Sequence, residues 1–340
     1  MTKGKLKVAF VGSGGMARNH SQALSKMKGL EIVGYADAAP AAARARVEEF
    51  GGAAFKDPVL MLDAVEPDAV WMCLPPFGHG VGLELVRRGI PFFVEKPVGI
   101  DVKLIRKIAG AIRRAELLTS AGYMNRYRKG VAAARKALAK DPPVFATGGW
   151  IGRTPSEEAT RKGIYKWWVR RARSGGQFHE QVTHTVDLAR HLMGEVVEVQ
   201  AYAAKGINPK TPSTFNIDDA VVVNLRFESG AVANLYGSTA GNAGGGGVSL
   251  KVFGARTSAL FSGWDHDLSL LEVGRKPVDI KGEEGIFGIE DAAFVKAVRT
   301  RDPKYIMSTY ADGARTAAVT LAANESLKTR KAVRPAKVSD

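Results

Sequence analysis

Residues 6–17 read LKVAFVGSGGMA, and this stretch decides the fold of the first part of the chain. Its apolar first half predicts a buried β-strand, and Gly12, Gly14 and Ala17 then follow in the pattern G-x-G-x-x-A. A helical pattern begins at about Met16, so the glycine turn joins a strand to a helix. Such a turn lets phosphate oxygens approach the backbone amides of the helix N-terminus. The stretch therefore predicts the pyrophosphate-binding turn of a dinucleotide site.

A carboxylate follows the second predicted strand. Residues 31–36, EIVGYA, form that strand, and Asp37 comes directly after it. A carboxylate at this place can bind both hydroxyls of the adenosine ribose and repels the 2′-phosphate of NADP. We therefore expect NAD, with NADP less favoured. This end of the cofactor site is expected to consist of Gly12, Ser13, Gly14, Gly15, Met16 and Asp37.

Short β-rich runs continue to alternate with helical patterns up to residue 124, which predicts a doubly wound parallel sheet. Ligands of such sheets lie beyond the carboxyl ends of the strands. Two strand ends carry unusual residues there, CLPPFGHG at 73–80 and VEKPVG at 94–99. Lys96 can exchange a proton with a substrate oxygen, or it is an ordinary solvated loop lysine. The expected cofactor contacts from these ends are Leu74, Pro75, Pro76, His79, Glu95 and Lys96.

The stretch SGGQFHEQVTHTVDLARH, residues 174–191, places several histidines and carboxylates on one predicted helix. A zinc site of the zincin type needs two histidines at i and i+4, whereas His179 and His184 are five residues apart. No metal site is expected. Glu180 and His184 do share a helical face, which is either a reacting face or a solvated polar one. The opposite, apolar face should pack in the core and comprises Phe178, Val182, Val186, Ala189 and Met193.

After residue 195 several runs alternate as strands of a sheet with one wet face, and the glycine-rich segment 241–247 is expected to be a hairpin loop between two of them. The predicted fold class is α/β. An N-terminal doubly wound parallel sheet is followed by an α/β domain with a large, open, mostly antiparallel sheet.

Composition and net charge indicate where the protein is expected to be and which partners it is expected to have. The 340 residues are 45% hydrophobic, no run approaches the length of a membrane helix, and Cys73 is the single cysteine, so a cytoplasmic protein is expected. The formal charge of +15 favours an anionic partner such as a nucleic acid, a membrane surface or an acidic metabolite. The basic residues are scattered without any DNA-reading motif, however, so a solvated basic surface is the preferred interpretation, with no nucleic-acid or membrane partner.

The motifs together resemble the glucose–fructose oxidoreductase, inositol dehydrogenase and MocA family (Gfo/Idh/MocA). VGSGGMARNHSQAL, VEKPVG, AGYMNRYRKG and SGGQFHEQVTHTVDLARHLMG occur in the family order, and the resemblance covers nearly the whole chain. It implies a Rossmann domain over residues 1–124 and a substrate-binding and oligomerisation domain over 125–340. A helix at about 312–328 is expected to pack back on the first domain. The resemblance also implies a homodimer or homotetramer.

The resemblance further implies that Lys96 and His184 share the acid–base work at a substrate hydroxyl. Many members carry an aspartate one turn before the histidine, where this chain has Glu180, so its partner is left open between His184, Lys96 and the substrate. The basic, aromatic segment 161–173 favours a binding wall for a sugar or an anion. The expected substrate contacts are Arg126, Tyr165, Trp168, Arg171, Glu180 and His184.

The predicted function is NAD-dependent oxidation of a secondary alcohol in a sugar, a cyclitol or a derivative of one, with or without an anionic group. Two alternatives stay open. One is an NADP-dependent keto-sugar reductase, and the other is a regulator of the same fold that binds nucleotide and sugar without catalysis.

Overall fold

The computed structural model describes residues 4–338, and the chain forms two compact units. Of the described residues, the first unit contains 4–124, the segment Gly285–Ala314 and Val338. The second contains Asn125–Glu284 and Arg315–Lys337. The division expected from the sequence, 1–124 and 125–340, is linear, whereas the segment Gly285–Ala314 clusters with the first unit.

The first unit is built on a six-stranded parallel sheet with the strand order β3-β2-β1-β4-β5-β6. This is the order of a doubly wound dinucleotide-binding fold, as the sequence predicted. The strands are β1 (Leu6–Val11), β2 (Leu30–Ala36), β3 (Ala53–Phe55), β4 (Ala69–Met72), β5 (Phe92–Val94) and β6 (Thr119–Ala121). The helices are α1 (Gly15–Leu24), α2 (Pro40–Phe50), α3 (Pro58–Val65), α4 (Gly82–Arg87), α5 (Val102–Arg114) and α11 (Ile286–Thr300), with single turns η1 (Pro76–Val81) and η4 (Pro303–Tyr305).

Local sequence signals explain where these helices begin. Asp57 and Asp101 cap α3 and α5, each accepting hydrogen bonds from two backbone N–H groups of the first turn. Proline stands at the start of α2 and α3, where its missing N–H costs nothing. The middle strands β4 and β5 are buried along their whole length, as expected for a sheet covered on both faces.

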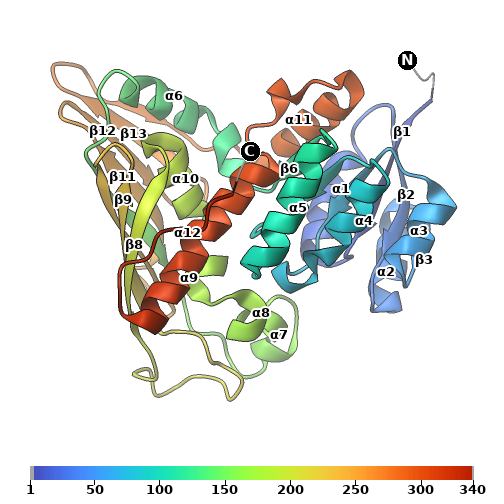
Figure 1. Cartoon of the computed structure of the whole chain (residues 1–340), viewed down its shortest axis with the longest axis horizontal. Helices are drawn as coiled ribbons and strands as arrows, with labels where there is room; N and C mark the ends of the chain where they lie inside the picture. Colours follow the sequence, from blue (N-terminus) through green and yellow to red (C-terminus); the bar gives the residue numbers. More distant parts are fainter. Residues whose placement is uncertain (1–3, 339–340) are drawn as a thin grey trace. The chain divides into compact units, whose positions relative to one another are not determined.

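Helix α11 completes the first unit from far along the chain (Figure 1). It packs against α1, and its Phe294 and Val295 join the core formed by β1, β4 and β5. The sequence did not predict that α11 packs in the first unit, because the contact joins segments about 270 residues apart in the chain.

The second unit is an eight-stranded sheet in the order β14-β13-β12-β11-β7-β10-β9-β8, in which only the β7–β10 pair is parallel. The strands are β7 (Phe145–Ile151), β8 (Val196–Ala204), β9 (Ala220–Phe227), β10 (Val232–Ser238), β11 (Gly247–Phe253), β12 (Thr257–Ser262), β13 (Asp267–Glu272) and β14 (Val278–Ile280). The helices are α6 (Lys129–Leu138), α7 (Tyr165–Trp168), α8 (Arg171–Ser174), α9 (Gln177–Glu180), α10 (Thr183–Met193) and α12 (Tyr310–Thr329), with single turns η2 (Met124–Tyr127) and η3 (Ala159–Arg161).

The hairpin expected at the glycine-rich segment 241–247 is wrong. Strands β10 and β11 do not pair with each other, because β7 lies between them and pairs with both. The segment therefore crosses the end of β7. Glycine also explains how β7 fits: a Cβ on Gly149 would overlap the carbonyl oxygen of Tyr236, and one on Gly148 would overlap that of Ser249.

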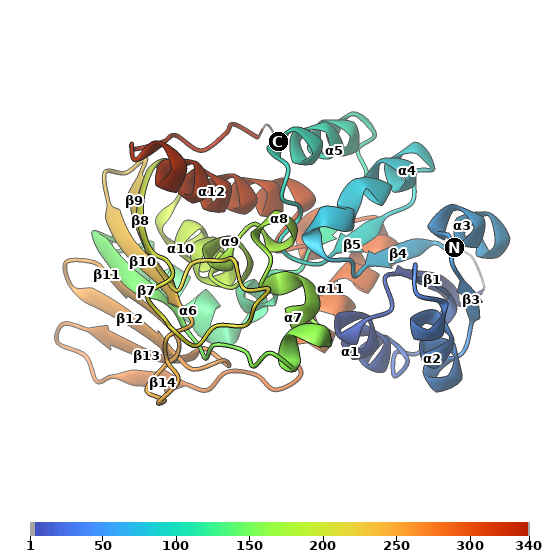
Figure 2. The same cartoon turned by 90° about the horizontal axis from the view of Figure 1, so that it is seen from below.

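One face of this sheet carries the core of the second unit. Side chains of α6, α10 and the later turns of α12 pack with the inward residues of the strands, and Figure 2 shows α10 and α12 on this side. The other face is exposed, and β9 alternates buried and exposed residues along its length. The first turn of α12 belongs to the first unit, where the Tyr310 backbone N–H donates to Thr119 Oγ1. Within residues 4–338, no helix combines the length and the apolar character needed to span a bilayer.

Candidate active site

Gly12 follows β1 and can only be glycine. Its φ of +91° lies in the left-handed region, and a Cβ there would stand 2.5 Å from the carbonyl oxygen of Cys73, at the end of β4. The first turn residue of the predicted pattern thus lies at the carboxyl ends of β1 and β4, where the strand order reverses.

The backbone at Gly14 and Gly15 offers amides that can donate to an anion. Gly14 and Gly15 are exposed at the start of α1, where no side chain caps the helix and no acidic residue occupies the first turn. Within the described part of the chain, the buried hydroxyl of Ser13 has no hydrogen-bond partner. Free amides at a helix N-terminus and an unpaired hydroxyl fit the pyrophosphate of a dinucleotide. Ala17 is fully buried, which allows α1 to pack closely on the sheet.

Asp37 lies beside this turn. Its Oδ2 accepts the N–H of Ser13 at 2.8 Å, and its Oδ1 accepts the N–H of Ala39 at 2.8 Å. Arg18 of α1 and Arg46 of α2 both pair with Glu49. A carboxylate in this place can accept hydrogen bonds from ribose hydroxyls.

The loop after β4 is ordered by a buried histidine. His79 Nε2 donates to the carbonyl oxygen of Leu74 at 2.9 Å, and burial lowers the pKa of His79, which is therefore neutral. Leu74 and Pro75 are half-buried, while Pro76 is buried. Of the four residues expected from this loop, Leu74 and Pro75 thus offer the accessible surface, and His79 holds the loop in shape.

Glu95 and Lys96 follow β5. The Lys96 side chain is half-exposed, whereas Glu95 is only 6% exposed. Glu95 Oε1 lies 2.9 Å from His20 Nε2, and Glu95 Oε2 accepts the backbone N–H of Lys96 at 3.1 Å. The expected cofactor contact Glu95 is therefore engaged within the protein. Sequence reasoning missed His20, because nothing in the local pattern pairs a residue of α1 with the end of β5.

In the second unit, the segment after Gly175 and Gly176 is two helices rather than one. The short helix α9 ends at Glu180, and α10 begins at Thr183. The one helix expected over this stretch is therefore interrupted at Gln181 and Val182. The predicted apolar face is confirmed, since it lies in the core of this unit and consists of Phe178, Val182, Val186, Ala189 and Met193.

The polar residues of this segment differ sharply in exposure. All of α10 is buried except His184 and His191, which are half-buried, so these two rings alone on the helix reach accessible surface. Glu180 is 1% exposed and accepts a hydrogen bond from Gln181 Nε2. His179 is fully buried with its Nδ1 2.7 Å from Thr320 Oγ1, which agrees with the packing role expected for it.

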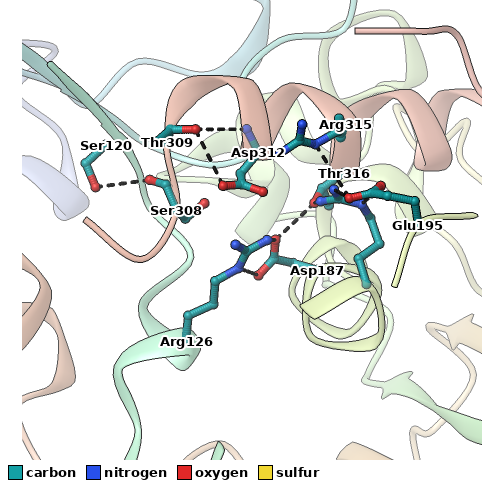
Figure 3. Close-up of polar contacts among 10 residues, drawn as sticks. Ser120, Arg126, Asp187, Glu195, Ser308, Thr309, Asp312, Arg315 and Thr316 are labelled. Atoms are coloured by element: carbon teal, nitrogen blue, oxygen red, sulfur yellow. Dashed lines mark hydrogen bonds and ion pairs between the residues drawn. The ribbon is translucent and has the colours of Figure 1, made fainter. Parts of the chain in front are cut away.

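Arg126 and Asp187 form a buried bidentate ion pair (Figure 3). The Arg126 Nε and Nη2 atoms lie 2.8 and 2.7 Å from the two carboxylate oxygens of Asp187. Thr316 Oγ1 donates to Asp187 at 3.0 Å and accepts from Arg190 at 2.8 Å, which extends the network to α12. The expected substrate contact Arg126 thus donates from Nε and Nη2 to Asp187 inside the protein, a pairing that the sequence did not predict.

The segment expected to form the substrate wall contains an aromatic cluster. Trp168 is 1% exposed and packs edge-on against Trp150 and Tyr165, whose ring centroids lie 6.2 and 5.5 Å away. Tyr165 itself is exposed, and Arg171 is half-buried with one nitrogen on Asp218 and another 3.4 Å from Asn324 Oδ1. Tyr165 and Arg171 therefore have accessible surface that a ligand could contact. Trp168 is buried and packs against the ring of Tyr165.

No metal centre is evident. Throughout residues 4–338, no group of three or more His, Cys, Asp or Glu side chains is arranged to hold a metal ion.

Comparison with known proteins adds two family matches. The model described as "Oxidoreductase family, NAD-binding Rossmann fold" matches residues 6–123, and the one described as "GFO/IDH/MocA C-terminal domain" matches residues 152–260. Among related sequences, the D-glucoside 3-dehydrogenase of Escherichia coli is 25% identical over 262 residues, 71% of this chain and 72% of that protein. The inositol 2-dehydrogenase of Rhizobium meliloti is 29% identical over 240 residues, 68% of each chain.

A solved structure shows the same fold. A levoglucosan dehydrogenase in complex with NADH superposes with a TM-score of 0.83 at 19% identity, covering 98% of this chain and 100% of that one.

Proposed function

The chain belongs to the Gfo/Idh/MocA family of NAD-binding oxidoreductases, and we propose that it oxidises a secondary alcohol of a sugar, cyclitol or sugar derivative with NAD. One observation carries the proposal. The glycine turn and Lys96 follow β1 and β5, two strands separated only by β4, so the nucleotide turn and a proton-exchanging amine share one edge of one sheet.

The cofactor would be held by the first unit. Gly12, Ser13, Gly14, Gly15 and Met16 would bind the pyrophosphate, and Asp37 would bind the adenosine ribose. Leu74, Pro75 and Pro76 would line the nicotinamide end, in a loop shaped by His79. When bound, the nicotinamide supplies the hydride acceptor of the oxidation.

Side chains of the protein would take up the hydroxyl proton of the substrate. Removal of a hydride from the carbinol carbon leaves the hydroxyl proton to be taken up, and Lys96 and His184 are the proposed acceptors. An imidazole suits this role because its unperturbed pKa lies near neutrality. His184 and His191 are the two half-buried residues of α10, and His184 is the one that lies four residues after Glu180, which supports its assignment to this role. Glu180, fully buried one turn earlier, is proposed to orient the site.

The substrate would contact Tyr165 and Arg171, with Trp168 packed against the ring of Tyr165. Exposed aromatic rings stack on the apolar faces of sugars, and a guanidinium can bind a carboxylate or phosphate in bidentate fashion. This supports a polyhydroxylated substrate, with an anionic group as the finer proposal.

Assembly and location are further parts of the proposal. The exposed face of the second sheet carries Tyr202, Val222 and Val232, which are 63%, 44% and 46% exposed. Apolar side chains on an open sheet face support a homodimer or homotetramer, and a cytoplasmic location is proposed together with it. Light scattering coupled to gel filtration tests the subunit number.

The decisive experiment is a substrate panel. Polyols, aldoses, uronic acids and nucleotide sugars are each incubated with NAD⁺ and with NADP⁺, and absorbance is followed at 340 nm. Turnover of one sugar class with NAD⁺ supports the proposal. Tight NADH binding without turnover of any compound would favour the non-catalytic regulator, and faster reaction with NADP⁺ would favour the keto-sugar reductase.

A further inference from the structure

His20 lies fully buried on α1, between two carboxylates of the first unit. Its Nδ1 is 2.8 Å from Asp291 Oδ1, and its Nε2 is 2.9 Å from Glu95 Oε1. A neutral imidazole can donate only one hydrogen bond, so two ionised carboxylates on opposite ring nitrogens require the doubly protonated ring. Burial alone would lower the pKa of His20, but Asp291 and Glu95 raise it well above its usual range.

At the Asp291 end of the Asp291–His20–Glu95 series, further contacts hold the carboxylate in place. Asp291 belongs to α11, is fully buried, and also accepts a hydrogen bond from Trp71 Nε1 of β4 at 2.8 Å. The rings of Phe93 and Phe287 pack against His20 with centroids 4.9 and 5.8 Å away. Three elements of the unit therefore fix the imidazole in one position and exclude water from it.

The Glu95 end leads to the proposed reacting group. One carboxylate oxygen of Glu95 is used by His20, and the other accepts the backbone N–H of Lys96. Glu95 thus transmits the position of the anchored imidazole to the backbone of Lys96. Both oxygens of Glu95 have assigned partners other than the Lys96 side chain.

We propose that His20 is a positioning residue for Lys96. It holds the Glu95 carboxylate in contact with the imidazole ring and with the Lys96 backbone N–H. This carboxylate therefore does not neutralise the side-chain amine of Lys96. The inference rests on the proposed acid–base role of Lys96. Asp291 serves as the anchor that keeps His20 charged and fixed.

Two substitutions of His20 separate its two contacts. A glutamine amide can replace the Nε2–H group, which faces Glu95, and an asparagine amide can replace the Nδ1–H group, which faces Asp291. Positioning through Glu95 predicts that His20→Gln keeps most of the activity and that His20→Asn loses it. A merely structural role predicts similar losses in both.

The kinetic test compares kcat, KM and NAD⁺ affinity in these variants. Misplacement of a reacting group by about 1 Å costs about 10²-fold, so His20→Asn should lower kcat by up to about that factor while KM and NAD⁺ affinity change little. Ser21→Ala is the matched control, because it removes a buried 2.7 Å contact to Tyr35 from the next position of α1 without touching Glu95. It should lower stability and leave kcat unchanged. Equal kcat in His20→Asn and His20→Gln would overturn the inference.

A second readout needs no substrate. Competitive acetylation with acetic anhydride at pH 8, followed by peptide mass spectrometry, reports the reactivity of Lys96 relative to the exposed Lys103. In His20→Asn the released Glu95 carboxylate holds the Lys96 proton, so Lys96 should acetylate more slowly than in wild type or His20→Gln. The same Lys96 rate in all three proteins would refute the inference. A failed substrate panel would instead refute the proposed function and leave this readout intact.

If His20→Asn does not fold, Glu95→Gln replaces it. The glutamine keeps the size of the side chain but weakens its contact with the imidazolium. It should therefore lower kcat through misplacement of the Lys96 backbone, without slowing the acetylation of Lys96. Wild-type kcat in a folded Glu95→Gln protein would also overturn the inference.

Discussion

The carboxylate of Asp37 and the backbone nitrogen of Ser13 are 2.8 Å apart, which ties the end of β2 to the glycine turn after β1. The second oxygen of Asp37 is held by the Ala39 amide, so the carboxylate has a fixed orientation. A fixed negative charge at the expected ribose position is the basis of the proposed preference for NAD.

Asp37→Ser should relax the preference for NAD⁺. The change removes the charge that repels a 2′-phosphate, so kcat/KM with NADP⁺ should rise relative to that with NAD⁺. Initial rates with both cofactors measure the ratio. Asp37→Asn is the control, since it keeps one acceptor oxygen for the Ser13 amide. Wild-type turnover that is equal or better with NADP⁺ would contradict the assignment.

Lys96→Met and His184→Ala should each lower kcat by about 10²–10⁴-fold, the usual contribution of a positioned acid or base. Because both groups serve one proton, the double variant should lose much less than the product of the single losses. Glu180→Gln should cost less than either. NADH binding, followed by fluorescence, should survive in all four proteins. Near-wild-type kcat in Lys96→Met would remove the lysine from the mechanism.

Arg171→Ala should raise KM for the substrate and leave NAD⁺ affinity unchanged. Arg171 also pairs with Asp218, so the substitution loosens that contact as well. Asp218→Asn loosens the same contact but keeps the guanidinium, and it serves as the matched control. Steady-state kinetics of both variants decide the matter. Equal effects on KM would mean that Arg171 acts only through Asp218.

Asp187→Ala should destabilise the second unit strongly. The substitution leaves the Arg126 guanidinium, which is 5% exposed, without its bidentate partner. Breaking such a buried pair from one side costs about 3–5 kcal/mol. Urea unfolding measures the loss. Arg126→Met combined with Asp187→Leu removes both charges and should recover much of it, whereas equal stability of the single and double variants would contradict the argument.

The contribution of His20 to stability should fall as the pH rises. Its folded-state pKa is raised, so the interaction with Asp291 and Glu95 is fully present below the unfolded pKa of about 6.5 and is lost as the pH rises through the folded value. The buried Cys73, whose pKa burial and both carboxylates raise, stays neutral over this range. The difference in unfolding free energy between wild type and His20→Gln, measured in urea from pH 6 to 9, should shrink. A difference that grows with pH would show that the imidazole is neutral in the native state.

The sequence by itself determined the first half of the fold and the outline of the nucleotide site. Gly12, Ala17 and Asp37 lie within one strand–helix–strand run, where hydrophobic periodicity and turn chemistry act over a few residues and can be recognised directly. Lys96 could be predicted as a candidate site residue for a related reason, because it stands at the end of a short buried strand.

Only the tertiary structure decided which distant residues meet. Strand β7 inserts between β10 and β11 through two glycines whose pattern does not predict a strand, and α11 returns to the first unit to bring Asp291 to His20, 271 positions earlier. Likewise, Arg126 was expected to contact substrate, whereas its observed hydrogen bonds go to Asp187. Periodicity reports which face of an element is buried. It carries no information on the partner across the core, which is selected by the packing of the whole unit.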